Sequence, residues 1–261
     1  MRIRLLTLNL AGLDHQWFER RADAVSTALR EYAPDVMCLQ EVSLQWQGSF
    51  YDQAYAVGCS VGLPVVAFCP YGDREQILSA QERGITVVAR WPLCSVETRL
   101  LPHGDADHPD NRVALFATVH SPVGDLRVAT THLSWRPDED LARRTQVRLM
   151  LEQIDRRQWD TDAMPLFIAG DFNALEHDVP IVQIKQRLRD AFREMHSSDP
   201  GITWRHDNPY NTGPDLPDRR LDYVFVGQHT SLRRVEVVLD APTPVFPSDH
   251  AGVLVEIETA R

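Results

Sequence analysis

The sequence has few cysteines, and their spacing lacks the patterns of cysteine-based scaffolds. There are four, Cys38, Cys59, Cys69 and Cys94, and none belongs to a Cys-x-x-Cys pair. Structural zinc sites and disulfide frameworks usually show clustered spacings of that kind. Cys38 and Cys69 lie within apolar, strand-like runs. We therefore expect buried free thiols rather than disulfides or a structural zinc site.

A long hydrophobic run is also missing. No stretch approaches the ~20 apolar residues that a membrane-spanning helix needs. The amino terminus leads directly into a strand pattern, without the basic and long apolar segments of a secretory signal. We expect a cytoplasmic, monomeric protein with no transmembrane segment.

The chain has no excess of positive charge. Lys and Arg total 27 against 37 Asp and Glu, which gives a formal net charge of −10. Non-specific binding along a nucleic acid requires a basic face, so the negative net charge argues against an extended nucleic-acid-binding surface. A local basic patch is still compatible with it.

Length and composition favour a single domain over residues 1–261. Hydrophobic residues make up 43% of the chain and charged residues 25%, which are ordinary values for a globular protein. The sequence shows no internal repeat, low-complexity tract or linker. A chain of this length buries enough apolar surface to fold without disulfide or metal support.

The most informative stretch is Gly170-Asp171-Phe172-Asn173-Ala174, which follows the apolar run 165–169. The run predicts a buried strand between a proline and a glycine. On an extended segment, Asp171 and Asn173 would point to the same side. A carboxylate beside an amide can hold a water molecule or a phosphate oxygen near a metal. The pattern is equally typical of an Asp/Asn turn that closes a strand, and the stretch alone does not decide between the two.

Polar residues also stand at the ends of other predicted strands. A strand up to Asn9, a helix over 18–32 with apolar residues at helical spacing, and a strand over 36–39 closing on Gln40-Glu41-Val42 form the first unit. Taken singly, Asn9 is typical of a turn and Glu41 of a solvated strand end. Further strands are predicted at 65–69, 84–90, 95–101, 112–120, 126–131, 165–169, 221–226, 232–239 and 252–257, and helices at 138–159 and 179–188.

Hairpins dominate the predicted connections. We expect 112–120 to pair with 126–131, and 95–101 with 84–90. The segment from Pro102 to Asp110 carries His and Asp residues, but no predicted element holds them in place, so we interpret it as a surface loop. Helices separated by runs of strands favour a two-sheet α/β sandwich over a doubly wound parallel sheet.

The polar strand ends belong to six short motifs that span nearly the whole chain. They are Thr7-Leu8-Asn9, Leu39-Gln40-Glu41-Val42, Thr131-His132-Leu133, Gly170-Asp171-Phe172-Asn173, Arg220-Leu221-Asp222-Tyr223 and Ser248-Asp249-His250. Each is weak alone, but their order resembles the endonuclease/exonuclease/phosphatase superfamily, which includes deoxyribonuclease I and neutral sphingomyelinases. The resemblance implies a four-layer α/β/β/α sandwich, with two mainly antiparallel sheets flanked by helices and the site at one end of both.

The resemblance further implies a divalent-metal-dependent phosphoester hydrolase, in the first place a phosphodiesterase that uses an activated water. The implied ligands of Mg²⁺, or of Mn²⁺, are Glu41, Asn9 and Asp249, because oxygen ligands suit hard cations. The implied catalytic residues are His132, Asp171, Asn173, Asp222 and His250.

Individual roles follow from the same resemblance. Asp171 and Asn173 would orient the attacking water. His250 would contact the scissile phosphate, with Asp222 holding its ring and favouring its charged form.

Two further residues, Arg112 and Glu82, match the superfamily more loosely. His132 and Arg112 would bind phosphate oxygens, and Glu82 would orient His132. For Arg112 and Glu82, an ordinary surface charge is an equally good interpretation.

The substrate stays open at this point. Abasic-site endonucleases carry an Asp two residues after the first Asn, where this chain has Ala11, which argues against DNA repair of that type. Segments 217–223 and 247–250 look closer to sphingomyelinase-like and generic bacterial branches. Loops must select the substrate among nucleic acid, phospholipid head group and small diester. A phosphomonoesterase and a non-catalytic binding module are the alternatives.

Overall fold

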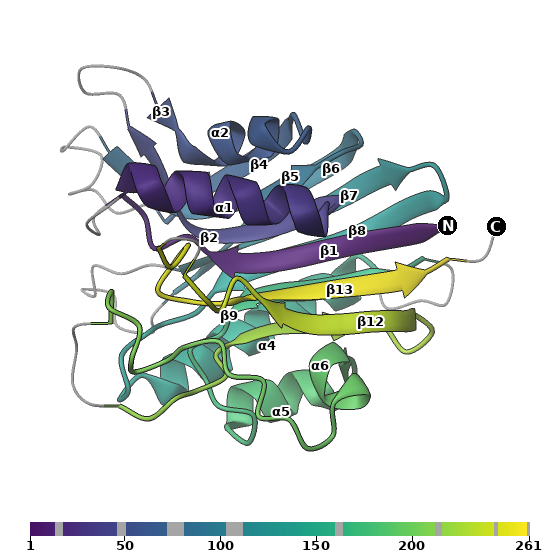
Figure 1. The fold of residues 1–261 in the computed structure, drawn as a ribbon. Coiled ribbons are helices and arrows are strands. Elements are labelled where there is room, and N and C mark those ends of the chain that lie inside the picture. The colour runs from purple at the N-terminus through teal and green to yellow at the C-terminus, as the bar shows by residue number, and fades with distance from the viewer. Residues whose placement is uncertain are drawn as a thin grey trace.

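A computed structural model describes residues 1–13, 18–45, 51–71, 81–102, 112–159, 164–211, 216–242 and 245–259. Two β-sheets lie face to face, with helices covering the outer side of each (Figure 1). The order of layers is therefore helices, sheet, sheet, helices. This arrangement confirms the four-layer α/β/β/α sandwich predicted from the sequence.

The first sheet has seven strands in the order β12-β13-β1-β2-β5-β4, with β3 paired to β2. Only β1 and β2 pair in parallel, and the other neighbours are antiparallel. Both central strands are buried along most of their length, as expected for strands covered on two faces. The strands are β1 (Arg2–Asn9), β2 (Val36–Gln45), β3 (Tyr51–Asp52), β4 (Val65–Pro70), β5 (Gln81–Ala89), β12 (Ser231–Val238) and β13 (Gly252–Glu258).

The second sheet has six strands in the order β10-β11-β9-β8-β7-β6. It repeats the pattern of the first, because one central pair, β8 and β9, is parallel and the others are antiparallel. The strands are β6 (Leu93–Leu101), β7 (Arg112–Ser121), β8 (Gly124–His132), β9 (Leu166–Asp171), β10 (Arg189–Asp190) and β11 (Asp222–Val226).

Helices α1 (Phe18–Tyr32) and α2 (Gln53–Ser60) cover the first sheet, and α4 (Asp140–Arg156) and α5 (Val179–Lys185) cover the second. The short α6 (Ala191–Met195) contacts β11 and β12. Three apolar clusters fill the layers, one between the sheets and one under each pair of helices. In α1, Val25 and Leu29 are buried, as the helical spacing predicted. No helix in the described ranges is both long and apolar enough to cross a membrane.

The strand directions bring the ends of several strands together. Strands β1, β8 and β9 finish, and β7, β11 and β13 begin, at one end of the sandwich, because parallel neighbours end at the same edge and antiparallel neighbours start there. The chain termini meet at the opposite end, where the Met1 amino group donates to Thr259 O at 3.1 Å. The motifs at strand ends therefore converge on one face of the fold.

One predicted hairpin is wrong. Strand β6 pairs with β7 in the second sheet and not with β5. Strand β5 already has β2 on one side and β4 on the other, so it has no free edge for a further strand. The Trp91-Pro92 segment carries the chain from the first sheet to the second.

Strand β2 also differs from the prediction, because it does not close at Gln40-Glu41-Val42 but continues to Gln45. The register with β5 shifts between Leu39 and Val42, and Glu41 adopts a left-handed φ of 51°. Such a bulge re-aims one side chain without ending the strand. Glu41 therefore reaches the end of the sandwich where the motifs converge from within a strand.

The thiol prediction is confirmed in part. All four cysteines are free, with Cys38 and Cys69 buried and Cys59 and Cys94 exposed. Except for Pro102, the predicted loop from Pro102 to Asp110 lies outside the described residues.

Candidate active site

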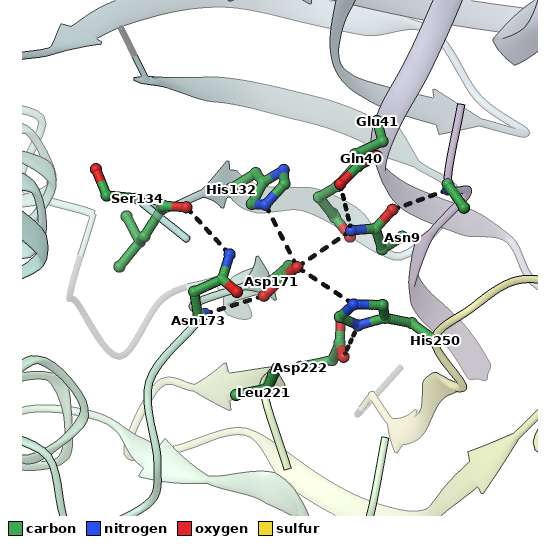
Figure 2. A network of polar contacts seen from close by, with 12 residues as sticks. Asn9, Gln40, Glu41, His132, Ser134, Asp171, Asn173, Leu221, Asp222 and His250 are labelled. Atoms are coloured by element: carbon green, nitrogen blue, oxygen red, sulfur yellow. Dashed lines mark hydrogen bonds and ion pairs between the residues drawn. The ribbon is translucent and has the colours of Figure 1, made fainter. Parts of the chain in front are cut away.

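Asn9 and Asp171 connect the two sheets at the end of the sandwich where the motifs converge (Figure 2). Asn9 ends β1 and Asp171 ends β9, and both are buried. The Asn9 Nδ2 group donates to Asp171 Oδ2 at 3.1 Å and to Glu41 Oε1 at 3.2 Å. Its Oδ1 accepts from the Ala11 backbone N–H at 2.9 Å, which sets the amide orientation. One amide thus ties together residues from three strands.

The segment after Asp171 is a turn and not the extended strand that the sequence alternation suggested. Asn173 has a left-handed φ of 46°, and its backbone N–H donates to Asp171 Oδ1 at 2.9 Å. The Asn173 Nδ2 group donates to Leu133 O at 3.2 Å. The two sequence interpretations are therefore compatible, because an Asx turn closes the strand and also holds the carboxylate in the site.

His250 and Asp222 form the pair that the sequence predicted. His250 Nδ1 lies 2.8 Å from Asp222 Oδ2, and His250 Nε2 lies 3.9 Å from Asp171 Oδ2. Burial alone would lower the pKa of His250, but the carboxylates of Asp222, Asp171 and Asp249 together raise it well above the ordinary value. The imidazole is therefore protonated at neutral pH, with Asp222 as its nearest counter-charge.

The pKa of Asp171 is also raised, but for a carboxyl group this shift favours the neutral, protonated form. Burial in the first place, and then the charge of Asp222, raise the pKa of Asp171 to about 7, although His250 opposes the shift. A carboxylate with that pKa exchanges protons readily at neutral pH. Because Asp222 and Asp171 are cross-strand partners in β11 and β9, the sheet register itself imposes their interaction.

His132 ends β8 and lies on the other side of Asp171, with its Nε2 3.4 Å from Asp171 Oδ2. Its Nδ1 contacts the Tyr71 hydroxyl at 2.9 Å. Burial, followed by the charges of Arg112, His250 and Arg83, lowers the pKa of His132 well below the ordinary value. This histidine is therefore neutral, unlike His250.

The structure does not bring Glu82 to His132. Both ring nitrogens of His132 face other groups, Tyr71 and Asp171. Glu82 lies inside β5, where side chains alternate between faces, and its neighbour Arg83 points to the site with Nη1 3.9 Å from Glu41 Oε2. Glu82 therefore faces away from the site. Tyr71 occupies the position beside His132 that the sequence analysis assigned to Glu82.

Glu41 and Asp249 supply the acidic oxygens of the site. Burial in the first place, and then the charge of Asp249, raise the pKa of Glu41, as expected for two carboxylates placed close together. The hydroxyl of Ser248 lies 3.1 Å from Asp249 Oδ1 and donates to Asn9 O at 2.6 Å. Carboxylate and amide oxygens are the ligands that Mg²⁺ prefers, so the residues fit such an ion.

A second acidic group, Asp171, Asp222 and His250, has ligand atoms within 4.8 Å of one another. A protonated imidazole cannot coordinate a metal, and His250 Nδ1 is occupied by Asp222. This group therefore suits proton transfer better than metal binding, and the oxygen atoms of Glu41 and Asp249 are a better fit to a hard cation.

Positive charge gathers around this acidic centre despite the acidic chain. Arg112, at the start of β7, is buried, and its Nε has no hydrogen-bond partner among the described residues. Its guanidinium lies 5.2 Å from the centre of the Tyr71 ring. Arg83 is near Glu41, and Arg219 stacks on Trp204 at 4.4 Å. Burial lowers the pKa of Arg219, and the nearby charge of Asp171 opposes that shift. Three guanidinium groups thus surround the site.

Sequence reasoning missed three of these residues as parts of the site. Tyr71 was placed in a polar loop after the predicted strand 65–69, and Arg83 and Arg219 were seen only as neighbours of motif residues. Buried Gln40, inside a quoted motif, links Thr7 to Thr130 across the two sheets. The signal that could have pointed to Tyr71 is a polar-capable aromatic at the end of a strand, which is too common to be decisive.

Comparison with known proteins yields a consistent family. The model of the "Endonuclease/Exonuclease/phosphatase family" matches residues 6–250. A probable CCR4-Not complex 3′-5′-exoribonuclease subunit Ccr4 of Encephalitozoon cuniculi is 24% identical, covering 89% of this chain and 55% of that protein. The chain spans 38% to 55% of the length of the curated relatives that it matches.

Solved structures agree on the fold. An endonuclease/exonuclease/phosphatase from Beutenbergia cavernae superimposes with a TM-score of 0.79 at 25% identity, covering 99% of this chain and 72% of that one. The human Nocturnin catalytic domain with bound sulfate gives a TM-score of 0.77 at 22% identity, covering 99% and 94%.

Proposed function

The chain belongs to the endonuclease/exonuclease/phosphatase family, and from that premise we propose that it is a divalent-metal-dependent phosphodiesterase that acts on nucleic acid. The observation that carries the proposal is the buried row His132, Asp171, His250 and Asp222 (Figure 2). The carboxylates of Glu41 and Asp249 lie next to this row. The row contains a neutral histidine, a carboxylate that titrates near pH 7 and a charged histidine. A site that only bound a ligand would not require three such different protonation states.

Hydrolysis needs an acceptor for the proton of the attacking water, and Asp171 is suited to that role. Its pKa of about 7 lets it take a proton at neutral pH and release it again. Asn9 and the Asn173 backbone N–H hold its two oxygens in fixed directions. The carboxylate therefore meets the water in one orientation.

The phosphate requires positive charge and hydrogen-bond donors. His250, kept protonated beside Asp222, donates from Nε2 to a phosphate oxygen as negative charge develops in the transition state. His132 and Arg112 contact further oxygens, and the guanidinium of Arg112 can do so with two parallel hydrogen bonds. These donors are in place before the substrate arrives.

A divalent cation, when bound, supplies Lewis acidity that stabilises the charge on the phosphate and leaving oxygens. Glu41, Asp249 and Asn9 would hold it. Because Mg²⁺ keeps several waters and needs only one or two carboxylates, this small ligand set is sufficient.

Nucleic acid is the substrate class best supported. The family relative from Encephalitozoon cuniculi is described as a probable 3′-5′-exoribonuclease. In this chain, Arg83, Arg112 and Arg219 form a local basic patch within an acidic protein. Trp204 beneath Arg219 offers a surface for a base to stack on. Such a patch can bind a few phosphates near the scissile bond, but it is too small to bind along a long duplex.

The test is a panel of single-stranded RNA, single-stranded DNA, a phospholipid and a nitrophenyl phosphate diester and monoester, assayed with Mg²⁺, Mn²⁺ and chelator. We expect cation-dependent cleavage of a nucleic acid. Glu41→Gln should lose most of that activity and bind Mg²⁺ more weakly while staying folded, because an amide is a poor ligand for a hard dication. Glu82→Gln, one strand away and facing elsewhere, is the matched control.

Turnover of phospholipid or monoester alone would overturn the substrate class, and no turnover on any substrate would favour the binding-module alternative. Equal loss in Glu41→Gln and Glu82→Gln would move the cation elsewhere. The single-domain organisation over residues 1–261, the monomeric state and the cytoplasmic location stay predictions.

A further inference from the structure

Three side chains of metal-binding type converge at the end of the second sheet that is opposite the catalytic end. Cys94 in β6, His120 in β7 and Asp125 in β8 each offer a ligand atom, and these atoms lie within 4.8 Å of one another. The three strands are hydrogen-bonded neighbours. His120 and Asp125 are five residues apart on one hairpin, but Cys94 lies 26 residues before His120, so the spacing matches no common metal-binding motif.

The backbone conformation explains how these side chains come together. The register of β6 against β7 shifts between Leu93 and Ser95, which makes Cys94 the extra residue of a β-bulge. Bulges re-aim a side chain, and this one leaves Cys94 exposed beside His120. The backbone N–H of His120 donates to Pro92 O at 2.8 Å, which fixes the bulged segment against β7.

His120 and Asp125 are already held in position. They are cross-strand partners at the base of the tight hairpin that joins β7 to β8. His120 Nδ1 lies 2.8 Å from Asp125 Oδ1. Two ligand atoms at a tetrahedral zinc lie about 3.3 Å apart, given Zn–N and Zn–O distances of ~2.0–2.2 Å. An ion could therefore replace the shared proton after a movement of about half an ångström.

The donor set selects the type of ion. A thiolate, an imidazole and a carboxylate match the preferences of zinc and similar transition metals, whereas Mg²⁺ prefers oxygen alone. Both histidine and carboxylate are partly open to solvent, with 66% and 32% of their side chains exposed. The fourth position of a tetrahedral ion would then be filled by water.

The location makes this cluster independent of the proposed active site. Arg112 begins β7 at the catalytic end, and His120 is eight residues further on, which corresponds to about 26 Å of extended strand. Asp125 likewise lies near the start of β8, while His132 ends it. An ion here cannot take part in the phosphoester chemistry.

We propose that Cys94, His120 and Asp125 form a second metal site, which binds zinc and is separate from the catalytic centre. The site joins three neighbouring strands at the β6 edge of the second sheet. Because the unfolded chain does not hold these ligands together, zinc binding stabilises the folded protein.

The experiment uses Co²⁺ as a spectroscopic probe in chelator-treated full-length protein. Ligation by a thiolate gives a charge-transfer band in the near ultraviolet that oxygen ligands do not give. We expect this band to saturate at one equivalent, to disappear on adding Zn²⁺ and to persist in excess Mg²⁺. Zn²⁺ should also raise the melting temperature.

Variants separate this site from the rest of the molecule. Cys94→Ser should abolish the band and reduce the thermal shift that Zn²⁺ produces, and His120→Ala should weaken binding roughly tenfold or more. Cys59→Ser, which removes the other exposed thiol, should retain both effects. Glu41→Gln should also retain them, so the outcome does not depend on the proposed function. A band that survives in Cys94→Ser, or that Mg²⁺ removes, would overturn the proposal.

Discussion

At the scale of single residues, the proposed chemistry depends on neighbouring groups that hold different charges at the same pH. His250 is charged, His132 is neutral, and Asp171 between them titrates near neutrality. Burial, the carboxylates of Asp222 and Asp249, and the charges of Arg112 and Arg83 create these differences. Changing one partner should therefore alter the function of its neighbour in a predictable direction.

The His250 and Asp222 pair should behave as a unit. His250→Ala should lower kcat by a factor of about 10²–10⁴, the usual range for a positioned acid–base group. Asp222→Asn should have a smaller effect, because the ring stays present but loses its charged partner at 2.8 Å. Steady-state kinetics of both single variants and the double variant should give a combined loss smaller than the product of the two. Independent losses would show that the two residues do not cooperate.

Activity should fall as the pH drops through about 7. The pKa of Asp171 is raised to about 7, chiefly by burial and by Asp222. Above that pH the carboxylate is ionised and accepts a proton, and below it the group is already protonated. His250, with its raised pKa, stays protonated across the same range. A kcat profile from about pH 5 to about pH 9 at constant ionic strength checks this. A flat acid limb would exclude Asp171 as the base.

Tyr71 should fix the tautomer of His132. Its hydroxyl accepts from the Glu41 backbone N–H at 3.2 Å, so its single hydrogen is available for His132 Nδ1. Burial raises the pKa of Tyr71 and keeps its hydroxyl protonated. His132 then carries its proton on Nε2, which faces Asp171.

Tyr71→Phe keeps the ring but removes that hydrogen. We expect a drop in kcat of about 10-fold, the loss of one orienting hydrogen bond. Nitrogen NMR of the His132 ring should change from one tautomer to a mixture. If the NMR spectrum of the variant matches the wild type, Tyr71 has no orienting role.

At the scale of secondary-structure elements, the position of Asp171 depends on how closely β9 approaches β8. Gly170 has a φ of 153°, and an added Cβ would lie 2.1 Å from Thr131 O. No side chain fits there without moving one of the two parallel strands. The residue before Asp171, the proposed base, is therefore glycine for steric reasons as well as for backbone freedom.

Gly170→Ala should destabilise the fold by about 3 kcal/mol or more, since overpacking and backbone strain combine. Gly124→Ala is the matched control, because Gly124 also has a positive φ, 110°, but nothing lies within 4 Å of the added Cβ. It should cost only the strain, about 1 kcal/mol. Chemical denaturation of both variants gives the comparison. Equal losses would mean that backbone conformation alone requires glycine at position 170.

At the scale of the whole molecule, charge is distributed unevenly. The net charge is −10, yet three arginines surround the proposed site. An acidic surface repels a polyanion, and only the patch attracts it. Binding should therefore involve few phosphates.

The affinity for single-stranded nucleic acid should depend only moderately on salt. With about three phosphate contacts, a plot of log K against log salt concentration should have a slope of about −2. Fluorescence anisotropy of a labelled oligonucleotide with the inactive His250→Ala variant measures it. A slope steeper than about −5 would require a basic surface well beyond the three arginines.

Much of the fold follows from local patterns in the sequence. The 3.6-residue spacing over 18–32 predicted α1 with the bounds that the structure shows, and the apolar runs predicted most strands. The six motifs placed Asn9, His132, Asp171, Asp222 and His250 at one end of the sandwich, where the structure has them. Periodicity and turn chemistry depend on residues that are close in the sequence, so they can be recognised without knowledge of the tertiary structure.

The remaining features were decided by tertiary structure alone. Strand β6 pairs with β7 because both edges of β5 are occupied. Tyr71 rather than Glu82 meets His132, because strand alternation turns Glu82 to the opposite face from Arg83. Cys94, His120 and Asp125 meet because a bulge and a tight hairpin align three strands. Each case depends on which edges and faces remain free once the sheets are assembled, and no local pattern in the sequence carries that information.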